Sequence, residues 1–365
     1  MAAIIAAGMA RFGDRWDKDE AALVKEDLED LKNVSSINAE EVFLANISYP
    51  LIRKNQSLQK SVSELTGIPI VHSFSEECGG SIALQQAAEA IDSGRIRKAL
   101  VIGVDKMSDL TSSEIGYISA LSLREEWQNR GLTLAAAYAL LENLYLEKYS
   151  KKSDEMHALP VSAHEHGSRN KNAQFQNMIS AEQVAQSALT AEPIRQLECA
   201  DWCDGAAALL LVSNKEAESH DKPVYLKEHA QITAASALEK GETLIPAIQK
   251  AIGNIKTAVQ EADIFELHDI FSFGEVMCIE SLGCCNPGEG LQWIEKNKKR
   301  INTGGGLKAC GYVPSANGLR QAAEIMLQLK NSAGERQVKN AKSGISVNLN
   351  GTGEKAAINV FSVEK

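Results

Sequence analysis

The chain has 365 residues, of which 44% are hydrophobic and 24% charged, and its formal net charge at pH 7 is -10. This balance is typical of a globular protein with enough apolar material for a large buried core. The acidic charge and the lack of a long basic run argue against nucleic-acid binding, and no apolar stretch is long enough to span a membrane.

The N-terminal segment and the cysteines predict a cytoplasmic protein. The apolar segment 1–8 is short and has no basic residue before it, so it predicts a first core strand rather than a signal peptide. The chain has seven cysteines, an odd number with scattered spacing. This pattern argues against a disulfide framework and favours a reducing compartment, and it lacks the spacing of a zinc site.

Apolar runs alternate with stretches of helical periodicity along the chain, which favours an α/β fold. The strands that we predict are 3–7, 41–45, 68–72, 99–103, 206–212, 224–235, 264–267, 344–349 and 356–363. The helices that we predict are 20–32, 57–65, 81–93, 132–149, 181–189, 243–252, 271–281 and 318–329.

These elements fall into two halves. The first half, 1–213, closes with the continuous apolar run 206–212, and a polar linker, 214–222, leads into the second half, 222–365. The segment from about 110 to 200 is rich in helix and polar loop and is predicted to be an insertion. Insertions of this length often cover an active site.

A cysteine, Cys78, stands at the predicted junction between a strand and a helix, in the stretch Ser-Glu-Glu-Cys-Gly-Gly-Ser at 75–81. A thiolate at a helix N-terminus is stabilised by unpaired backbone N–H groups, and a free N–H there could bind an oxyanion. The two glycines would let a substrate approach the backbone. Glu76 and Glu77 would raise the thiol pKa if they pointed inward. A structural cysteine is the alternative on this local pattern.

Two further stretches are candidates for a site. His268 follows a predicted strand and precedes a predicted helix, which is a suitable place for a side chain that faces a site, although a purely structural histidine fits equally well. The stretch 302–318 is rich in glycine and small residues, and it predicts a tight loop against which a ligand or another backbone packs.

The order and surroundings of these stretches resemble the thiolase superfamily, in particular the sterol-carrier-protein type and the archaeal acetoacetyl-CoA thiolase type. Other similar stretches are 6–13, 91–94, 101–109, 172–175, 204–209, 280–283, 287–290, 304–309 and 324–329. The resemblance covers nearly the whole chain. It implies the α/β thiolase fold: two similar βαβαβαββ-type halves in a layered α-β-α-β-α arrangement with an inserted loop domain.

The resemblance also implies roles for individual residues. Cys78 matches the nucleophile that accepts an acyl group from a thioester, but the stretch after it is one residue shorter than in the family. A gapless reading anchored on Gly80 and Ser81 instead puts Glu77 at the nucleophile position. His268 matches a histidine that helps to form an oxyanion hole. His164 lies where family members carry an Asn-His pair and is predicted to contact the acyl-CoA.

Two departures change the expected acid–base chemistry. The cysteine of the family's His-Asp-Cys-Phe motif is Ile270 here, and the histidine that activates the nucleophile is Tyr312. Isoleucine cannot transfer a proton, and tyrosine is a poor base with a pKa near about 10. Acid–base groups each contribute about 10²–10⁴-fold to a rate, so we expect inefficient Claisen condensation unless other groups substitute.

Two functions remain open on this evidence. In the first, the chain is a divergent acyltransferase: Cys78 takes an acyl group from acyl-CoA or a carrier thioester, His268 holds the oxyanion, and Tyr312 orients the acyl group. In the second, it is a non-catalytic thiolase-like subunit that binds acyl-CoA or scaffolds a multi-enzyme complex. No permanently bound cofactor or metal is expected. The resemblance implies a homodimer or tetramer, and a complex with hydroxymethylglutaryl-CoA synthase-like and small acyl-CoA-binding OB-fold/zinc-ribbon proteins.

Overall fold

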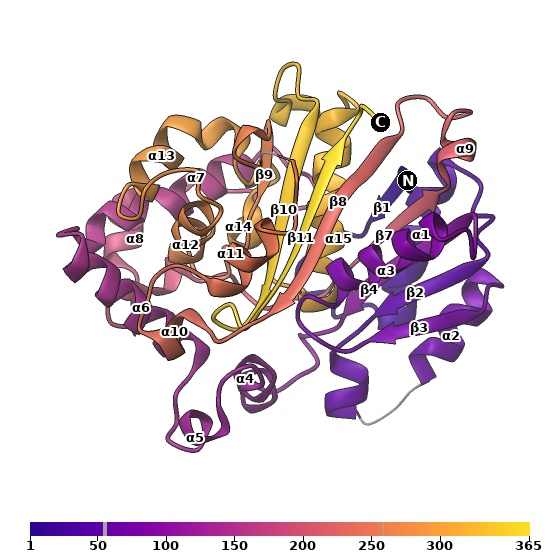
Figure 1. Cartoon of the computed structure of the whole chain (residues 1–365). Helices are drawn as coiled ribbons and strands as arrows, with labels where there is room; N and C mark the ends of the chain where they lie inside the picture. Colours follow the sequence, from indigo (N-terminus) through magenta and orange to yellow (C-terminus); the bar gives the residue numbers. More distant parts are fainter. Residues whose placement is uncertain (54–56, 258) are drawn as a thin grey trace.

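The computed structural model describes residues 1–53, 57–257 and 259–365. Within these ranges, nine strands form one mixed sheet in the order β3-β2-β4-β7-β1-β8-β11-β10-β9 (Figure 1). The strands of this sheet are β1 (Ala3–Met9), β2 (Glu41–Ala45), β3 (Ile70–Phe74), β4 (Lys98–Asp105), β7 (Gly205–Val212), β8 (Val224–Thr233), β9 (Ile264–Glu266), β10 (Ser343–Asn350) and β11 (Lys355–Ser362). A separate hairpin pairs β5 (Leu189–Ala191) with β6 (Ile194–Arg195).

Helices cover both faces of this sheet. They are α1 (Glu20–Val34), α2 (Ser57–Thr66), α3 (Gly79–Asp92), α4 (Ser112–Ala120), α5 (Glu125–Gln128), α6 (Leu134–Lys148), α7 (Ala158–Gly167), α8 (Ala181–Gln186), α9 (Asn214–Ala217), α10 (Ala237–Lys240), α11 (Pro246–Ile252), α12 (Phe273–Ser281), α13 (Gly290–Asn297), α14 (Gly306–Cys310) and α15 (Pro314–Leu329). No helix in the described ranges is long and apolar enough to cross a membrane.

The strand order repeats along the sheet. In the first part it is β3-β2-β4-β7-β1, where β7, the last of these strands in the chain, lies between β4 and the first strand, β1. In the second part, β9, β10, β11 and β8 follow the same order, and Ile301 forms an isolated bridge to Phe265 beside β9, where the first part has β3. The third strand of the second part is therefore reduced to a single bridge.

The sheet bends around the helix pair α3 and α15. Both helices pack on β4 in the first part of the sheet, while α3 also contacts β11 and α15 also contacts β10. Five strand spacings separate β4 from β10, a distance of about 24 Å in a flat sheet. A single helix has a diameter of only about 10–12 Å, so α15 could not contact both strands if the sheet were flat. The two parts of the sheet therefore enclose the pair. With α1 against the first part and α11 against the second, the layers run α-β-α-β-α.

The two central helices approach each other closely at Gly80. A Cβ built at this position would lie 2.3 Å from the backbone oxygen of Ser315 and 3.2 Å from the Leu319 side chain. This glycine was predicted to let a substrate approach the backbone. The structure corrects that prediction, because the group that needs the space is the first turn of α15.

We expect Gly80→Ala to destabilise the protein by about 1–3 kcal/mol, because a backbone atom rather than a flexible side chain must move. Gly116→Ala in α4 is the matched control, since its new Cβ would meet nothing within 4 Å. The control should be neutral or stabilise by up to about 1 kcal/mol through helix propensity. Urea unfolding of both variants measures the difference, and equal stabilities would contradict the packing argument.

The glycine-rich stretch 302–318 contains more helix than its composition predicts. Residues 306–310 form α14, and α15 begins at Pro314 rather than at 318. The proline occupies the first helical turn, where a missing N–H has no cost and the fixed φ favours the helix. The prediction of a loop throughout this stretch was wrong. It relied on the high glycine content and did not use Pro314 as a signal for the start of a helix.

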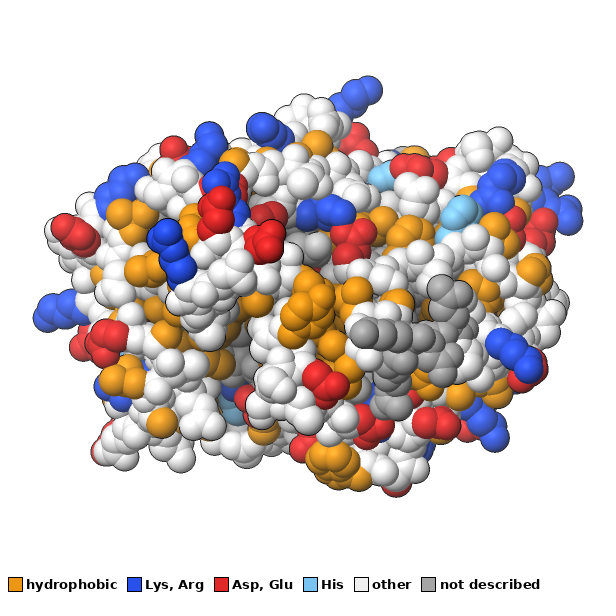
Figure 2. Space-filling model, turned by 90° about the horizontal axis from the view of Figure 1, so that it is seen from below, with side chains coloured by type: hydrophobic (Ala, Val, Ile, Leu, Met, Phe, Trp, Pro, Cys, Tyr) orange, Lys and Arg blue, Asp and Glu red, His pale blue; other side chains and the backbone are white. Residues whose placement is uncertain are grey.

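An arm formed by α4 and α5 projects from the lower edge of the molecule (Figure 1). It belongs to the predicted insertion between β4 and β7. Tyr117 and Leu121 of this arm are exposed, at 52% and 38% of their surface. Viewed from below, apolar side chains gather in the middle of the face from which the arm projects (Figure 2). Ile118 and Leu123 are buried and hold the arm on the body of the protein.

Candidate active site

Three of the residues singled out from the sequence meet around the turn between β10 and β11. His268 follows β9, Tyr312 lies between α14 and α15, and Glu77 lies two residues before α3. All three side chains are buried, with 1%, 1% and 4% of their surface exposed. The end of β10 supplies Leu349 and the turn supplies Gly351, and their backbone N–H groups donate to the side chains of His268 and Glu77, respectively.

His268 is a neutral hydrogen-bond donor in this site. Its Nδ1 accepts a hydrogen bond from the Leu349 backbone N–H at 3.3 Å, so the proton of the neutral ring lies on Nε2. Burial lowers the pKa of His268 to about 3, so the ring stays neutral at physiological pH. The ring meets that of Tyr312 edge to face, with centroids 5.9 Å apart.

Tyr312 is held by its backbone and by an aromatic neighbour. Its N–H donates to the Asp201 carbonyl at 2.7 Å, and its ring packs edge to face on Trp202 at 4.7 Å. Burial raises the pKa of Tyr312 well above the usual value, and the charge on Glu77 raises it further. The hydroxyl therefore stays protonated and is a donor, not a base.

Glu77 lies in this group with one oxygen bound and one free. Its Oε2 accepts hydrogen bonds from the Gly351 N–H at 2.7 Å and from the Ser122 hydroxyl at 3.2 Å. Its Oε1 is buried and has no hydrogen-bond partner among the described residues. Burial raises the pKa of Glu77 to about 7, against the opposing effect of these two hydrogen bonds. A carboxyl with this pKa exchanges a proton readily near neutral pH.

Cys78 borders this group, but its thiol has apolar neighbours. It is the residue before the first turn of α3, as predicted, but its side chain is fully buried in an apolar cluster with Ile82, Ala357 and Phe74. Burial raises the pKa of the thiol well above the usual value, and the carboxylates of Glu76 and Glu77 raise it further, as the sequence suggested. This burial outweighs the stabilisation of a thiolate that we expected from the helix N-terminus. The catalytic role of Cys78 stays a prediction.

The backbone N–H of Cys78 is not the free donor that we expected. It donates to Oδ1 of Asn350 at 2.9 Å. Since the Gly351 N–H binds Glu77, two N–H groups that could have faced a substrate oxygen are occupied by side chains of the chain itself. His268 Nε2 and the Tyr312 hydroxyl are two side-chain donors for such an oxygen.

His164 makes its contacts with residues outside this group. It is in α7, where its Nδ1 lies 2.9 Å from the Asn177 carbonyl oxygen and its ring stacks on Phe175 at 5.6 Å. Its Nε2 is buried without a hydrogen-bond partner in the described part of the chain. Burial and the nearby Lys308 lower the pKa of His164. The predicted contact with acyl-CoA stays a prediction.

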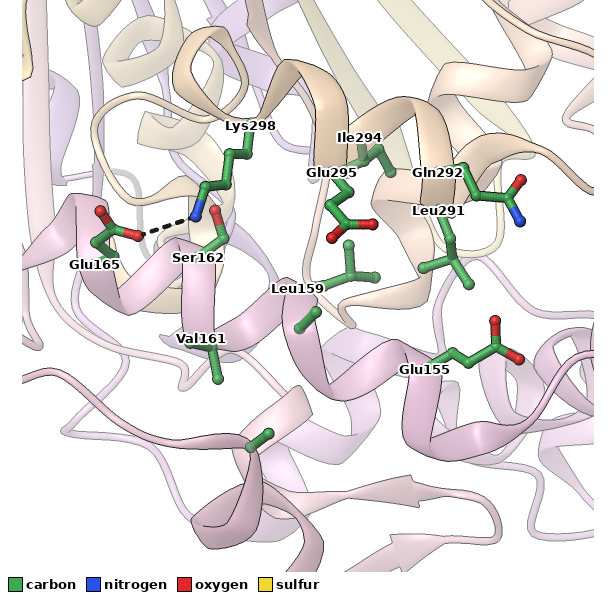
Figure 3. Close-up of a pocket in the computed structure, with 12 residues that line it drawn as sticks. Glu155, Leu159, Val161, Ser162, Glu165, Leu291, Gln292, Ile294, Glu295 and Lys298 are labelled. Carbon is green, nitrogen blue, oxygen red and sulfur yellow. Dashed lines mark ion pairs between the residues drawn. The ribbon is translucent and has the colours of Figure 1, made fainter.

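A cavity of about 460 Å³ lies between α7 and α13 (Figure 3). Apolar side chains, among them Leu159, Leu291 and Ile294, line it, and an ion pair between Lys298 and Glu165 closes one end. None of Glu77, Cys78, His164, His268 or Tyr312 belongs to its lining. Its size suits a small ligand, but it is separate from the site described above.

Sequence reasoning missed the partners that the insertion and the last turn bring to Glu77. Ser122 comes from the arm, and Tyr138 of α6 donates a hydrogen bond to the Gly351 carbonyl at 3.0 Å. The only local signal was the stretch Asn-Gly-Thr-Gly at 350–353, which the sequence marks as a turn.

Comparison with known proteins identifies the family of this fold and site. Residues 2–215 match the family model described as thiolase, N-terminal domain, and residues 225–363 match thiolase C-terminal domain-like. The chain therefore belongs to the thiolase superfamily, which confirms the resemblance.

Three similar proteins illustrate the relationship. The chain is 31% identical to an acetyl-CoA acetyltransferase of Methanothermobacter thermautotrophicus, over 99% of both chains. It is 28% identical to sterol carrier protein 2 of Rattus norvegicus, over 81% of this chain and 59% of that protein. Among solved structures, the Ltp2-ChsH2(DUF35) aldolase superposes with a TM-score of 0.82 at 20% identity, covering 100% of this chain and 98% of that one. The predicted thiolase fold with a large mixed sheet is thereby confirmed.

Proposed function

We propose that this chain acts on the acyl group of an acyl-CoA thioester by proton transfer through Glu77, and that it makes or breaks a carbon–carbon bond next to the thioester carbonyl. The observation that carries the proposal is the placement of Glu77. Its carboxylate accepts the Gly351 N–H and lies close enough to Tyr312 to raise the pKa of that hydroxyl. Its Oε1 has no hydrogen-bond partner among the described residues, while the Cys78 thiol lies in an apolar cluster.

The chemistry follows from the three side chains. Oε1 of Glu77 takes a proton from the carbon next to the thioester carbonyl. The electron pair of that C–H bond forms the C=C bond of an enolate, and the π pair of the carbonyl moves onto its oxygen. Hydrogen bonds from His268 Nε2 and the Tyr312 hydroxyl stabilise the enolate oxygen in the buried site. The enolate carbon then bonds to a carbonyl acceptor, whose π electron pair moves onto its oxygen and takes up the proton held by Glu77. In the reverse direction Glu77 removes that hydroxyl proton, and cleavage of the carbon–carbon bond releases the enolate. The naming of one similar fold as an aldolase agrees with this class of reaction.

Acyl transfer through Cys78 is the second candidate, favoured by the 31% identity to a protein named acetyl-CoA acetyltransferase. It would form an acyl-thioester intermediate and needs a Cys78 thiolate that reaches the substrate. The buried thiol with a strongly raised pKa counts against it. A non-catalytic thiolase-like subunit is the third outcome.

The proposal extends to assembly and location. We propose a cytoplasmic homodimer or tetramer with no permanently bound cofactor. A complex with hydroxymethylglutaryl-CoA synthase-like and OB-fold/zinc-ribbon proteins is also part of the proposal. The solved aldolase contains a DUF35 component, which supports the idea of a protein partner.

Mass spectrometry distinguishes the three outcomes. Acetyl-CoA and longer acyl-CoAs are incubated with the protein in D₂O, and deuterium next to the thioester is measured together with the intact mass of the protein. We expect deuterium incorporation without acylation of the protein, unchanged in Cys78→Ala. A mass gain that depends on Cys78 would instead establish the acyltransferase. Neither signal with any donor, with co-purified partners present, would leave the non-catalytic subunit.

A further inference from the structure

Ser122 reaches the candidate site from the arm. It lies between α4 and α5, 45 residues from Glu77 in sequence, and its hydroxyl donates to Glu77 Oε2 at 3.2 Å. The next residue, Leu123, is buried, with 3% of its surface exposed. Leu123 thus anchors the arm directly beside this hydrogen bond.

The β10–β11 turn packs tightly against Ser122. Gly351 has φ of +52°, and a Cβ built on it would lie 2.5 Å from the Ser122 Cβ and 2.8 Å from its Oγ. The same glycine donates its N–H to Glu77 Oε2 at 2.7 Å. Ser122 and Gly351 are therefore in contact with each other, and both donate a hydrogen bond to Oε2 of Glu77.

The two carboxylate oxygens of Glu77 consequently differ. Oε2 accepts both hydrogen bonds, whereas Oε1, also buried, accepts none from the described residues. A carboxylate held at one oxygen cannot rotate without losing both bonds, so its other oxygen keeps a fixed direction. A general base needs this fixed geometry more than it needs added basicity.

We infer that Ser122 is a positioning residue, whose hydroxyl, together with the Gly351 N–H, fixes the Glu77 carboxylate so that Oε1 is the oxygen that exchanges the proton. This inference rests on the proposed function for the identity of the proton donor. The contact itself is independent of the reaction.

A measurable consequence is the acidity of Glu77. Both hydrogen bonds favour the ionised carboxylate, so removal of one raises the pKa of Glu77. Glu354 also acts on Glu77, and its negative charge raises the same pKa. Tyr138, Tyr312 and Cys78 feel the charge of Glu77, and each is uncharged at neutral pH because burial raises its own pKa. No cation among these groups replaces the lost hydroxyl.

The test is a ¹³C NMR titration of the full-length protein labelled at glutamate carboxyl carbons, with the Glu77 signal assigned by its loss in Glu77→Gln. We expect Ser122→Ala to move the titration upward by about one pH unit, the size of a hydrogen bond to a charged group. Ser122→Thr, which keeps the hydroxyl, should restore the wild-type midpoint. Ser119→Ala is the matched control, because that hydroxyl binds the Gly116 carbonyl within α4.

The pH profile of deuterium incorporation separates this inference from the proposed function. A parallel upward shift in the profile of Ser122→Ala supports both. A shifted NMR titration in a protein that exchanges no deuterium supports the role of Ser122 and refutes the proposed function. An unchanged Glu77 midpoint in a folded Ser122→Ala protein overturns the inference, whatever the exchange rate.

Discussion

Glu77→Gln should lower the rate of deuterium incorporation into acyl-CoA about 10²–10⁴-fold, the usual contribution of a general base. Glutamine has the shape of glutamate and its side-chain oxygen can still accept the Gly351 N–H, so the fold should be kept. What it cannot do is accept a proton at the position of Oε1. The measurement is the initial rate of exchange at saturating acyl-CoA.

Two neighbours on either side of Glu77 are the controls. Glu76→Gln changes a partly exposed carboxylate that is paired with Lys355, and its rate should stay within about threefold of wild type. Cys78→Ala removes the buried thiol and should leave the exchange rate similar. If Glu77→Gln keeps its rate and Cys78→Ala loses it, the proposed role of Glu77 is wrong and acyl transfer through Cys78 becomes the better account.

The pH dependence of the same reaction follows from the acidity of Glu77. The base must be ionised, and burial raises the pKa of Glu77 to about 7. The rate should therefore be low at pH 5, rise through pH 7 and level off above it. His268 does not add a second limb in this range, because burial lowers its pKa to about 3. A rate that falls between pH 6 and 8 would contradict a carboxylate base.

The strands were predicted well because their signals are local. β2 and β7 are short apolar runs bounded by polar residues, and the structure places them within one residue of the predicted bounds. α4, α7 and α13 were missed. α4 has a single buried residue, Ile118, and thus no continuous apolar face to mark it. The local signal that marks α4 is instead its N-terminus, where Thr111 and Glu114 form a capping box.

The site was only partly predictable for a related reason. His268 and Tyr312 are adjacent to strand and helix ends, which the sequence shows. The partners that distinguish Glu77 from Cys78 lie 45 and 274 residues away along the chain, at Ser122 and Gly351. No spacing rule connects them, so the sequence could not predict these contacts. The assignment of the nucleophile position to Cys78 or to Glu77 stays a prediction, and the Glu77→Gln and Cys78→Ala variants test it.

The largest stability effect that we expect comes from Asp204, a fully buried carboxylate just before β7. It accepts hydrogen bonds from the Lys106 ammonium at 2.8 Å, from both the N–H and the hydroxyl of Ser108, and from the Arg15 N–H. Removing one partner of a buried ion pair costs about 3–5 kcal/mol, since it leaves the other charge buried. Asp204→Ala should therefore lose a large part of a typical domain's stability of about 5–15 kcal/mol.

Asp109→Ala provides the matched control, because Asp109 pairs with the same ammonium at 3.1 Å but is 39% exposed at its side chain. Exposed pairs contribute about 0–1 kcal/mol, so the two variants should differ severalfold in urea unfolding. Equal losses would mean that burial does not set the strength of this network.

The hydrogen bonds of Asp204 also connect this stabilising network with the candidate active site. Lys106 and Ser108 follow β4 at the root of the arm that carries Ser122, and Cys203, beside Asp204, donates its N–H to the Tyr312 carbonyl at 3.1 Å. Asp204 and its neighbour Cys203 thus link the root of the arm to the segment between α14 and α15 that contains Tyr312. If this connection positions the arm, Asp204→Asn, which keeps the shape but not the charge, should raise the Glu77 midpoint in the direction of Ser122→Ala. Asp109→Ala should not, because Asp109 lies on the exposed side of Lys106, away from the Asp204–Tyr312 connection.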